Sequence, residues 1–298
     1  MRSRGGALVW RVEDLDGPRA VPGAAEQQVE EARWLGLDWD EGPGGDGPFM
    51  PYRQSERNAH YEAALARLAG VGRLFPCRRS RKDLATLATA PHGRAGLPPY
   101  PARWRPKHLP PGWFGTRAAT GHPDAALRFR VADAPVTFVD RVQGRIKEDV
   151  AAEVGDFVLQ RRDGVYAYQL AVVVDDLAMG ITEVVRGADL LDSTARQVQL
   201  IEALGGTPPR YAHLPLVVDA HGEKLSKRDG ALTISALREA GVAPGAVVGW
   251  LAWALGQQGT PTPVVPAALV TAFRWDRVPA TPIVVPDDLP DRLRAASP

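Results

Sequence analysis

The sequence predicts an α/β protein with a parallel sheet, a basic and proline-rich insertion that carries antiparallel strands, and a helical C-terminal region. Mostly apolar runs over residues 7–12, 168–174 and 181–185 end in charged residues, which is typical of strands buried in a parallel sheet. Strictly alternating segments over residues 127–131 and 136–142 predict antiparallel strands instead. At 298 residues, the chain is long enough for two domains, or for one body with an insertion.

The first predicted strand, residues 7–12, runs directly into Glu13 and Asp14. Carboxylates at the carboxyl end of a buried strand lie where open α/β sheets bind their ligands. The two acids are explained equally well as helix-capping groups. Helices are predicted over residues 25–35 and 55–68, the second with Ser55 as its N-cap.

The segment from Arg73 to Arg130 is strongly basic, with twelve Lys or Arg and two acidic residues. Its local net charge of +10 leaves −9 for the rest of a chain whose total is +1. Such segregation suggests a polyanionic partner, although a solvated basic loop accounts for it as well. Eight prolines between Pro91 and Pro123 predict an irregular excursion within this insertion.

The rest of the chain alternates strands and helices before ending in helices. After an antiparallel strand at residues 156–160, the runs at 168–174 and 181–185 end at Asp175-Asp176 and Arg186-Gly187. The remaining predictions are a strand at 214–218 and helices at 192–204, 232–240, 243–255 and 267–273.

Lys224, Lys227 and Arg228 place three cations within five residues, between a predicted strand and a glycine. A basic loop that leaves a strand is suited to holding phosphates. A solvated turn is the alternative for a lone basic cluster.

Composition narrows the class of protein further. No run of about 18 apolar residues is present, and the first residues lack the apolar core of a secretion signal. We therefore expect a cytoplasmic protein without membrane association. The single cysteine, Cys77, excludes an intrachain disulfide and a cysteine-rich zinc site.

Taken together, six segments resemble the catalytic half of the glutamyl-tRNA synthetases, and more closely their short paralogues, the glutamyl-Q tRNA(Asp) synthetases. They occur in the family's order, and the last is similar to the family's KMSKS loop. The segments are residues 11–19, 52–57, 156–161, 167–176, 180–190 and 224–228. Only 70 residues follow Arg228, which favours the short paralogue over a full synthetase with an anticodon-binding part.

The resemblance implies a class I Rossmann-type sheet and a two-step reaction. Glutamate would be activated by ATP, accompanied by Mg²⁺, to glutamyl-adenylate and then transferred to the queuosine base in the anticodon region of tRNA(Asp). Lys227 would be the catalytic residue, and Lys224, Lys227 and Arg228 would bind ATP. Glu13, Tyr168 and Arg186 would surround the amino acid, since a carboxylate suits an ammonium group and a guanidinium suits a carboxylate.

Other roles for these three residues remain open at the level of sequence. Glu13 is also explained as a capping acid, Tyr168 as a core tyrosine with a satisfied hydroxyl, and Arg186 as the partner of Asp175 or Asp189. The alternative activities are charging of a tRNA acceptor end by a synthetase-like catalytic fragment, and mere binding of RNA or amino acid by an inactive, truncated paralogue.

Two departures from the family pattern give further expectations. The family's HIGH-type segment, with the first strand and helix of the nucleotide fold, lies upstream of the position of Met1, so we expect weak or absent pyrophosphate exchange from this chain. Of the four zinc-ligand positions in relatives, Arg79 and Trp104 replace two cysteines, so no structural zinc is expected.

We expect a monomer with four regions. Residues 1–72 would form the first half of the catalytic domain, and residues 73–163 would form the insertion. Residues 164–222 would form the second half, and residues 223–298 would hold the KMSKS-like loop and the helical C-terminal region.

Overall fold

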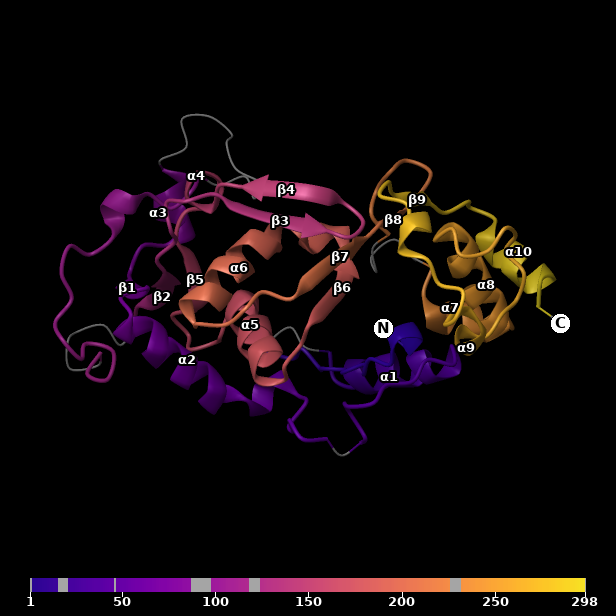
Figure 1. Cartoon of the computed structure of the whole chain (residues 1–298), viewed down its shortest axis with the longest axis horizontal. Helices are drawn as coiled ribbons and strands as arrows, with labels where there is room; N and C mark the ends of the chain where they lie inside the picture. The colour runs from indigo at the N-terminus through magenta and orange to yellow at the C-terminus, as the bar shows by residue number, and fades with distance from the viewer. Residues whose placement is uncertain are drawn as a thin grey trace.

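The computed structural model describes residues 2–15, 21–45, 47–86, 98–117, 124–225 and 232–297. Its centre is a four-stranded sheet with helices packed below it in the view of Figure 1. A smaller antiparallel sheet lies at one end and a group of short helices at the other. The predicted α/β class with a parallel sheet is confirmed.

The central sheet has the order β4-β3-β7-β6. Strand β7 pairs in parallel with both β3 and β6, whereas β3 and β4 form an antiparallel hairpin at the edge. The antiparallel strand predicted over residues 136–142 is therefore confirmed by β3. The bounds are β3 Val136–Asp140, β4 Gly144–Glu148, β6 Glu183–Gly187 and β7 Arg210–Leu214.

Helices α5 (Tyr168–Ala178), α6 (Thr194–Ala203) and α2 (Asn58–Gly70) enclose the main hydrophobic core. Every residue of α5 from Gln169 to Asp175 is buried. The prediction of a strand over residues 168–174 was wrong, because a helix buried on all sides shows the same continuous apolar run as a strand in a parallel sheet. Helix α6 confirms the helix predicted over residues 192–204.

The smaller sheet has the order β1-β2-β5, all antiparallel. Two of its strands were predicted, but β1 was not, because Pro76 lies within it and basic residues follow it. The bounds are β1 Leu74–Cys77, β2 Ala126–Phe129 and β5 Phe157–Gln160. The short helices α3 (Arg81–Ala85) and α4 (Val150–Glu153) flank this sheet.

The C-terminal helices surround a second hydrophobic cluster. Helix α1 (Ala24–Trp34) lies beside them in Figure 1, where Gln27 Nε2 donates to Ser235 Oγ at 2.8 Å. Their bounds are α7 Ile234–Glu239, α8 Pro244–Ala254, α9 Pro266–Leu269 and α10 Leu289–Ala295. Helices α1, α7 and α8 were predicted, whereas α10 was not.

Four boundaries differ from prediction. Residues 7–12 form isolated bridges through Val9 and Val12 rather than a ladder. Ser55 lies in a 3-10 turn and donates to Asp14, so it does not cap α2. The strand predicted over residues 214–218 is divided, with β7 ending at Leu214 and β8 (Val217–Val218) pairing in parallel with β9 (Ile283–Val284). The helix predicted over residues 267–273 is only the four residues of α9.

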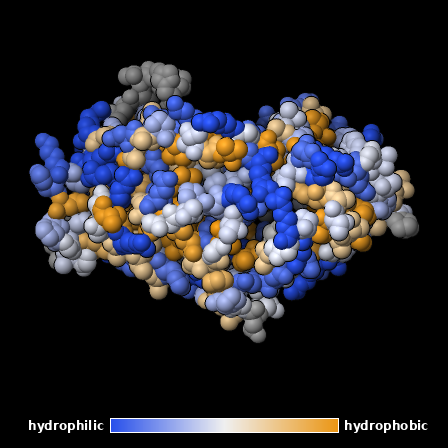
Figure 2. Space-filling view, in the orientation of Figure 1, coloured by the Kyte–Doolittle hydropathy of each residue, from blue (hydrophilic) through white to orange (hydrophobic). Residues whose placement is uncertain are grey.

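Hydrophilic and hydrophobic residues are interspersed over the face shown in Figure 2. Among the described residues, no helix is both long enough and apolar enough to cross a membrane.

Candidate active site

Arg186 lies on β6 at the carboxyl end of the parallel strands, directly opposite His213 on β7. Its Nε donates to His213 Nε2 at 3.0 Å, and its Nη2 donates to Thr194 Oγ1 at 2.9 Å. Nη1 lies 3.4 Å from the hydroxyl of Tyr168. The structure thus brings Arg186 and Tyr168 together, although they are 18 residues apart in the chain.

No carboxylate pairs with Arg186 anywhere in the described part of the chain. The two acids considered as internal partners are engaged elsewhere: Asp175 bonds to Arg57, and Asp189 pairs with Lys224. In the described structure the hydrogen-bond partners of this half-buried guanidinium are neutral groups, which suits it to an anionic ligand.

Tyr168 opens helix α5, and its hydroxyl accepts a hydrogen bond from Arg186 Nη1 at 3.4 Å. Burial raises the pKa of Tyr168, although the charge of Arg186 and hydrogen bonds from Gln197 and Arg186 act in the opposite direction. The phenol is therefore neutral near pH 7. Because Arg186 donates to its oxygen, the hydroxyl can donate its own hydrogen to a ligand beside Arg186.

Glu13 follows the bridged segment at Val12 and keeps 45% of its side chain exposed. Its nearest cation is Arg11, with Nη2 at 4.0 Å, and Arg11 itself bonds to Asp176 at 2.5 Å. Partial burial raises the pKa of Glu13, Arg11 opposes that shift, and the charges of Asp176 and Asp175 add to it. Among the described residues, Glu13 has only this 4.0 Å contact with Arg11 as an ion pair.

The neighbouring acid, Asp14, holds two segments of the chain together. Its carboxylate accepts from the backbone and the hydroxyl of Ser55 at 2.9 and 2.8 Å and from Arg53 at 3.2 Å. Of the two acids that end this segment, Asp14 therefore ties the chain together and Glu13 remains available for a ligand.

Lys224 forms an ion pair with Asp189, which belongs to the 3-10 helix Ala188–Ser193 beside Arg186. Both side chains are substantially exposed, so the pair has little energetic weight. Lys227 and Arg228 lie outside the described residues. The ion pair nevertheless brings the start of the basic segment next to the carboxyl end of β6.

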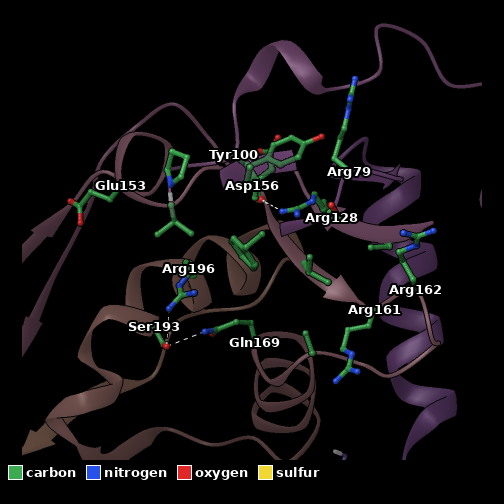
Figure 3. A pocket seen from close by; sticks show the side chains of 18 of the residues that line it. Arg79, Tyr100, Arg128, Glu153, Asp156, Arg161, Arg162, Gln169, Ser193 and Arg196 are labelled. Atoms are coloured by element: carbon green, nitrogen blue, oxygen red, sulfur yellow. Dashed lines mark hydrogen bonds between the residues drawn. The ribbon is translucent and has the colours of Figure 1, made fainter. Parts of the chain in front are cut away.

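A cavity of about 950 Å³ adjoins this site on the side of β2, β5 and α4. Gln169, which follows Tyr168, lines it and donates to Ser193 Oγ at 3.0 Å (Figure 3). Figure 3 shows arginines distributed around its walls. They are Arg79, Arg128, Arg161, Arg162 and Arg196.

The positions expected to hold zinc in relatives form a different arrangement here. Cys77 Sγ lies 3.3 Å from the Tyr100 hydroxyl, and the Arg79 guanidinium lies over the Trp104 ring at 5.1 Å. The Tyr100 and Trp104 rings meet edge to face at 5.5 Å. Since an arginine and an indole stand against each other at two of the four positions, the residues present do not fit a tetrahedral zinc site.

Three residues beside the site were not predicted from the sequence: Arg11, Asp140 and His213. Arg11 carries a weak signal, because it precedes the two acids that were singled out. His213 is a lone histidine in a mostly apolar strand, which is an ordinary feature of a protein core.

Comparisons with known proteins identify the family. The chain matches the family of class I tRNA synthetases (E and Q), catalytic domain, over residues 1–259. It is 47% identical over 286 residues to a glutamyl-Q tRNA(Asp) synthetase of Symbiobacterium thermophilum, covering 96% of this chain and 87% of that protein. A protein of the same name from Nitratidesulfovibrio vulgaris is 45% identical over 294 residues, covering 98% and 90%. The chain belongs to the glutamyl-Q tRNA(Asp) synthetase family.

The fold agrees with this family. A crystal structure of a glutamate tRNA ligase from Elizabethkingia meningosepticum in complex with its amino acid superposes with a TM-score of 0.82 at 28% identity. That match covers 98% of this chain but only 63% of the ligase, so the chain spans less than two thirds of the ligase's length. As a member of the glutamyl-Q tRNA(Asp) synthetase family, the chain is a ligase-type enzyme of synthetase class I.

Proposed function

We propose that this enzyme activates glutamate with ATP and transfers the glutamyl group to the queuosine base of tRNA(Asp). The observation that carries the substrate assignment is the charge of Arg186, which no described carboxylate pairs with. Together with the free hydrogen of Tyr168 it forms a donor pair for the side-chain carboxylate of glutamate. Glu13 supplies the negative charge for the substrate ammonium.

In the first step the glutamate α-carboxylate attacks the α-phosphorus of ATP and pyrophosphate leaves. This step needs positioning and charge neutralisation rather than proton transfer. Lys224, Lys227 and Arg228 would neutralise the triphosphate together with Mg²⁺, and Lys227 would steady the charge that develops on it. The ion pair of Lys224 with Asp189 supports this role for Lys224, since it brings that residue beside the strand that carries Arg186.

In the second step a hydroxyl of the acceptor attacks the carbonyl carbon of the adenylate, its proton is lost and AMP leaves. The cavity next to Gln169 offers room for the acceptor nucleoside, and the arginines on its walls suit nucleic-acid phosphates. A monomer bound to tRNA through the basic insertion is consistent with the local excess of cations.

Transfer of labelled glutamate tests the proposal. The enzyme is incubated with ATP, Mg²⁺ and tRNA(Asp) that either contains or lacks queuosine, and Arg186→Met is compared with Arg292→Met on the exposed face of α10. We expect transfer only to the queuosine-containing tRNA and a loss of about a hundredfold for Arg186→Met alone. Equal labelling of both tRNAs would instead support charging of the acceptor end.

Glutamate-dependent exchange of pyrophosphate into ATP separates the ligase from a binding-only protein. The same assay tests the expectation of weak exchange from this chain. Calorimetric binding of glutamate without any exchange would favour the binding-only alternative, and absence of both would end the assignment of Glu13, Tyr168 and Arg186 to a glutamate pocket.

A further inference from the structure

A buried chain of three side chains leads from the interior of the sheet to Arg186. His213 Nδ1 lies 2.6 Å from Asp140 Oδ2, and both side chains are fully buried. On the other side of the imidazole, Nε2 receives the hydrogen bond from Arg186 Nε at 3.0 Å. The three residues lie on β3, β7 and β6, which are neighbours in that order in the sheet.

The contacts define which nitrogen of His213 carries its hydrogen. Arg186 Nε can only donate, so Nε2 of His213 must be the acceptor. Nδ1 must then carry the hydrogen and donate it to Asp140. Burial lowers the pKa of His213 despite the opposing hydrogen bond that its ring donates to Asp140, in agreement with a neutral ring.

Asp140 is held firmly in its acceptor role. Its Oδ1 accepts from the backbone N–H groups of Val142 and Gln143, both at 2.9 Å. Burial alone would raise the pKa of Asp140, but these bonds and the one from His213 outweigh it and keep the carboxyl ionised. An ionised Asp140 can accept hydrogen bonds but cannot donate them, so it allows only the Nδ1–H tautomer of His213.

We propose that Asp140 and His213 are positioning residues that set the selectivity for a substrate carboxylate by fixing the orientation of Arg186. His213 takes the Nε hydrogen, and Thr194 and the carbonyl of Leu190 take the Nη2 hydrogens at 2.9 and 3.3 Å. Nη1 is left at the open side next to Tyr168. This inference rests on the proposed function, because it assumes that Arg186 binds the carboxylate of glutamate.

The substitution Asp140→Asn tests the chain at its far end. The amide oxygen must take the place of Oδ1, because two backbone N–H groups point at it, so the amide nitrogen faces His213 Nδ1. His213 would then carry its hydrogen on Nε2. Two N–H groups would face each other there, and the hydrogen bond from Arg186 Nε would be lost. The matched control is Glu148→Gln, a buried acid on β4 in the same sheet that contacts neither His213 nor Arg186 in the described structure.

The readout is the calorimetric affinity for glutamate, with glutamine as the competing amino acid, because this chain is expected to catalyse pyrophosphate exchange only weakly. For Asp140→Asn we expect the Kd for glutamate to rise about tenfold to a hundredfold, the loss of one charge-assisted hydrogen bond, with the Kd for ATP unchanged. The preference for glutamate over glutamine should narrow by the same factor. Glu148→Gln should leave the affinity for glutamate and the preference over glutamine as in the wild type. Unchanged selectivity in Asp140→Asn would overturn the inference.

Substitutions of His213 provide a second test if Asp140→Asn folds poorly. Glutamine can present its amide oxygen near the position of Nε2, so His213→Gln should keep much of the selectivity that His213→Leu loses. Equal losses of selectivity in the two variants would overturn the inference, because the hydrogen-bond acceptor would then make no difference and only the packing of the side chain would matter.

Nitrogen-15 NMR of the imidazole groups tests the tautomer independently of substrate. The His213 signals are assigned by their absence in His213→Gln; we expect a neutral Nδ1–H tautomer in the wild type and Nε2–H in Asp140→Asn. An Nε2–H tautomer in the wild type would overturn the inference. If the wild type shows the expected tautomer but calorimetry detects no glutamate binding, the proposed function fails; if glutamate binds equally to wild type and Asp140→Asn, only the positioning role fails.

Discussion

Arg57 Nε donates to Asp175 Oδ1 at 2.6 Å, and neither side chain has more than 2% of its surface exposed. The other oxygen of Asp175 accepts from Gln54 Nε2 and from the Tyr61 hydroxyl, both at 2.9 Å. Nη1 of Arg57 donates to the carbonyls of residues 49 and 51, both at 2.9 Å. One buried carboxylate of α5 thus ties α2 and the chain before it to the helix that carries the Tyr168 hydroxyl.

We predict that Asp175→Ala costs about 3–5 kcal/mol of unfolding free energy, because it leaves the buried Arg57 guanidinium without its counter-charge. Denaturant unfolding measures the loss. The control is Asp276→Ala, which removes the exposed partner of Arg274 and should leave the unfolding free energy nearly unchanged. Similar losses in the two variants would contradict the importance of the buried pair.

The binding of glutamate is expected to weaken on the acidic side of neutrality. Partial burial raises the pKa of Glu13 despite the opposing charge of Arg11, so the carboxylate takes up a proton at a higher pH than a freely exposed glutamate would. Only the ionised form attracts the substrate ammonium. Affinity should therefore be full above the raised pKa and fall as the pH drops through it.

Calorimetric titration with glutamate at a series of pH values checks this dependence. In Glu13→Gln, glutamate binding should be weak at every pH, without the fall in affinity at acidic pH. The control Glu26→Gln, at an exposed residue, should keep that fall. An unaltered step in Glu13→Gln would assign the titration to another group.

The sequence predicted the parts of the fold whose pattern is specific. Alternation of apolar and polar residues made β2 and β3 recognisable, although all four residues of β2 are buried and only β3 has exposed positions. The apolar run of α5 fits a buried helix and a buried strand equally well. The glutamate-site residues came from the resemblance to a family, which carries spatial information that composition lacks. Asp140 and His213 were missed because they meet only through the strand order, 73 residues apart in the chain.

Arg11 is predicted to stabilise the fold by an amount that depends on pH. Burial raises the pKa of Asp176 and Glu13, and Arg11 is the largest opposing influence on both. Arg11→Met would raise both pKa values further. The folded state should therefore lose about 3 kcal/mol of stability near neutral pH, where both carboxyls are ionised in the unfolded chain. The deficit should shrink as the pH falls through the raised values and both carboxyls become neutral.

Urea unfolding of wild type and variant at neutral and acidic pH measures this deficit. Arg238→Met is the control, since it removes an exposed partner of Glu30 and should cost less than about 1 kcal/mol at either pH. A deficit for Arg11→Met that grows toward acidic pH would have the wrong sign for this account.

The insertion is predicted to keep its stability without zinc, because Trp104 occupies one of the ligand positions and packs against two neighbours. The Arg79 guanidinium lies 5.1 Å from its ring centre, and the Tyr100 ring meets it at 5.5 Å. Trp104→Ala should cost about 1–2 kcal/mol through these contacts. Trp253→Ala is the control: that indole is 44% exposed, on α8, and its removal should cost less.

Metal analysis and thermal unfolding complete the test. Treatment with a chelator should leave the Tm of the wild type unchanged, since an arginine and a tryptophan cannot act as zinc ligands in place of two cysteines. Stoichiometric zinc, or a Tm that falls on chelation and recovers with added zinc, would contradict the prediction. A wild type that is stable without metal, together with a destabilised Trp104→Ala, would show that aromatic and cation–π packing stabilises this insertion. In other small domains, metal ligation provides that stability.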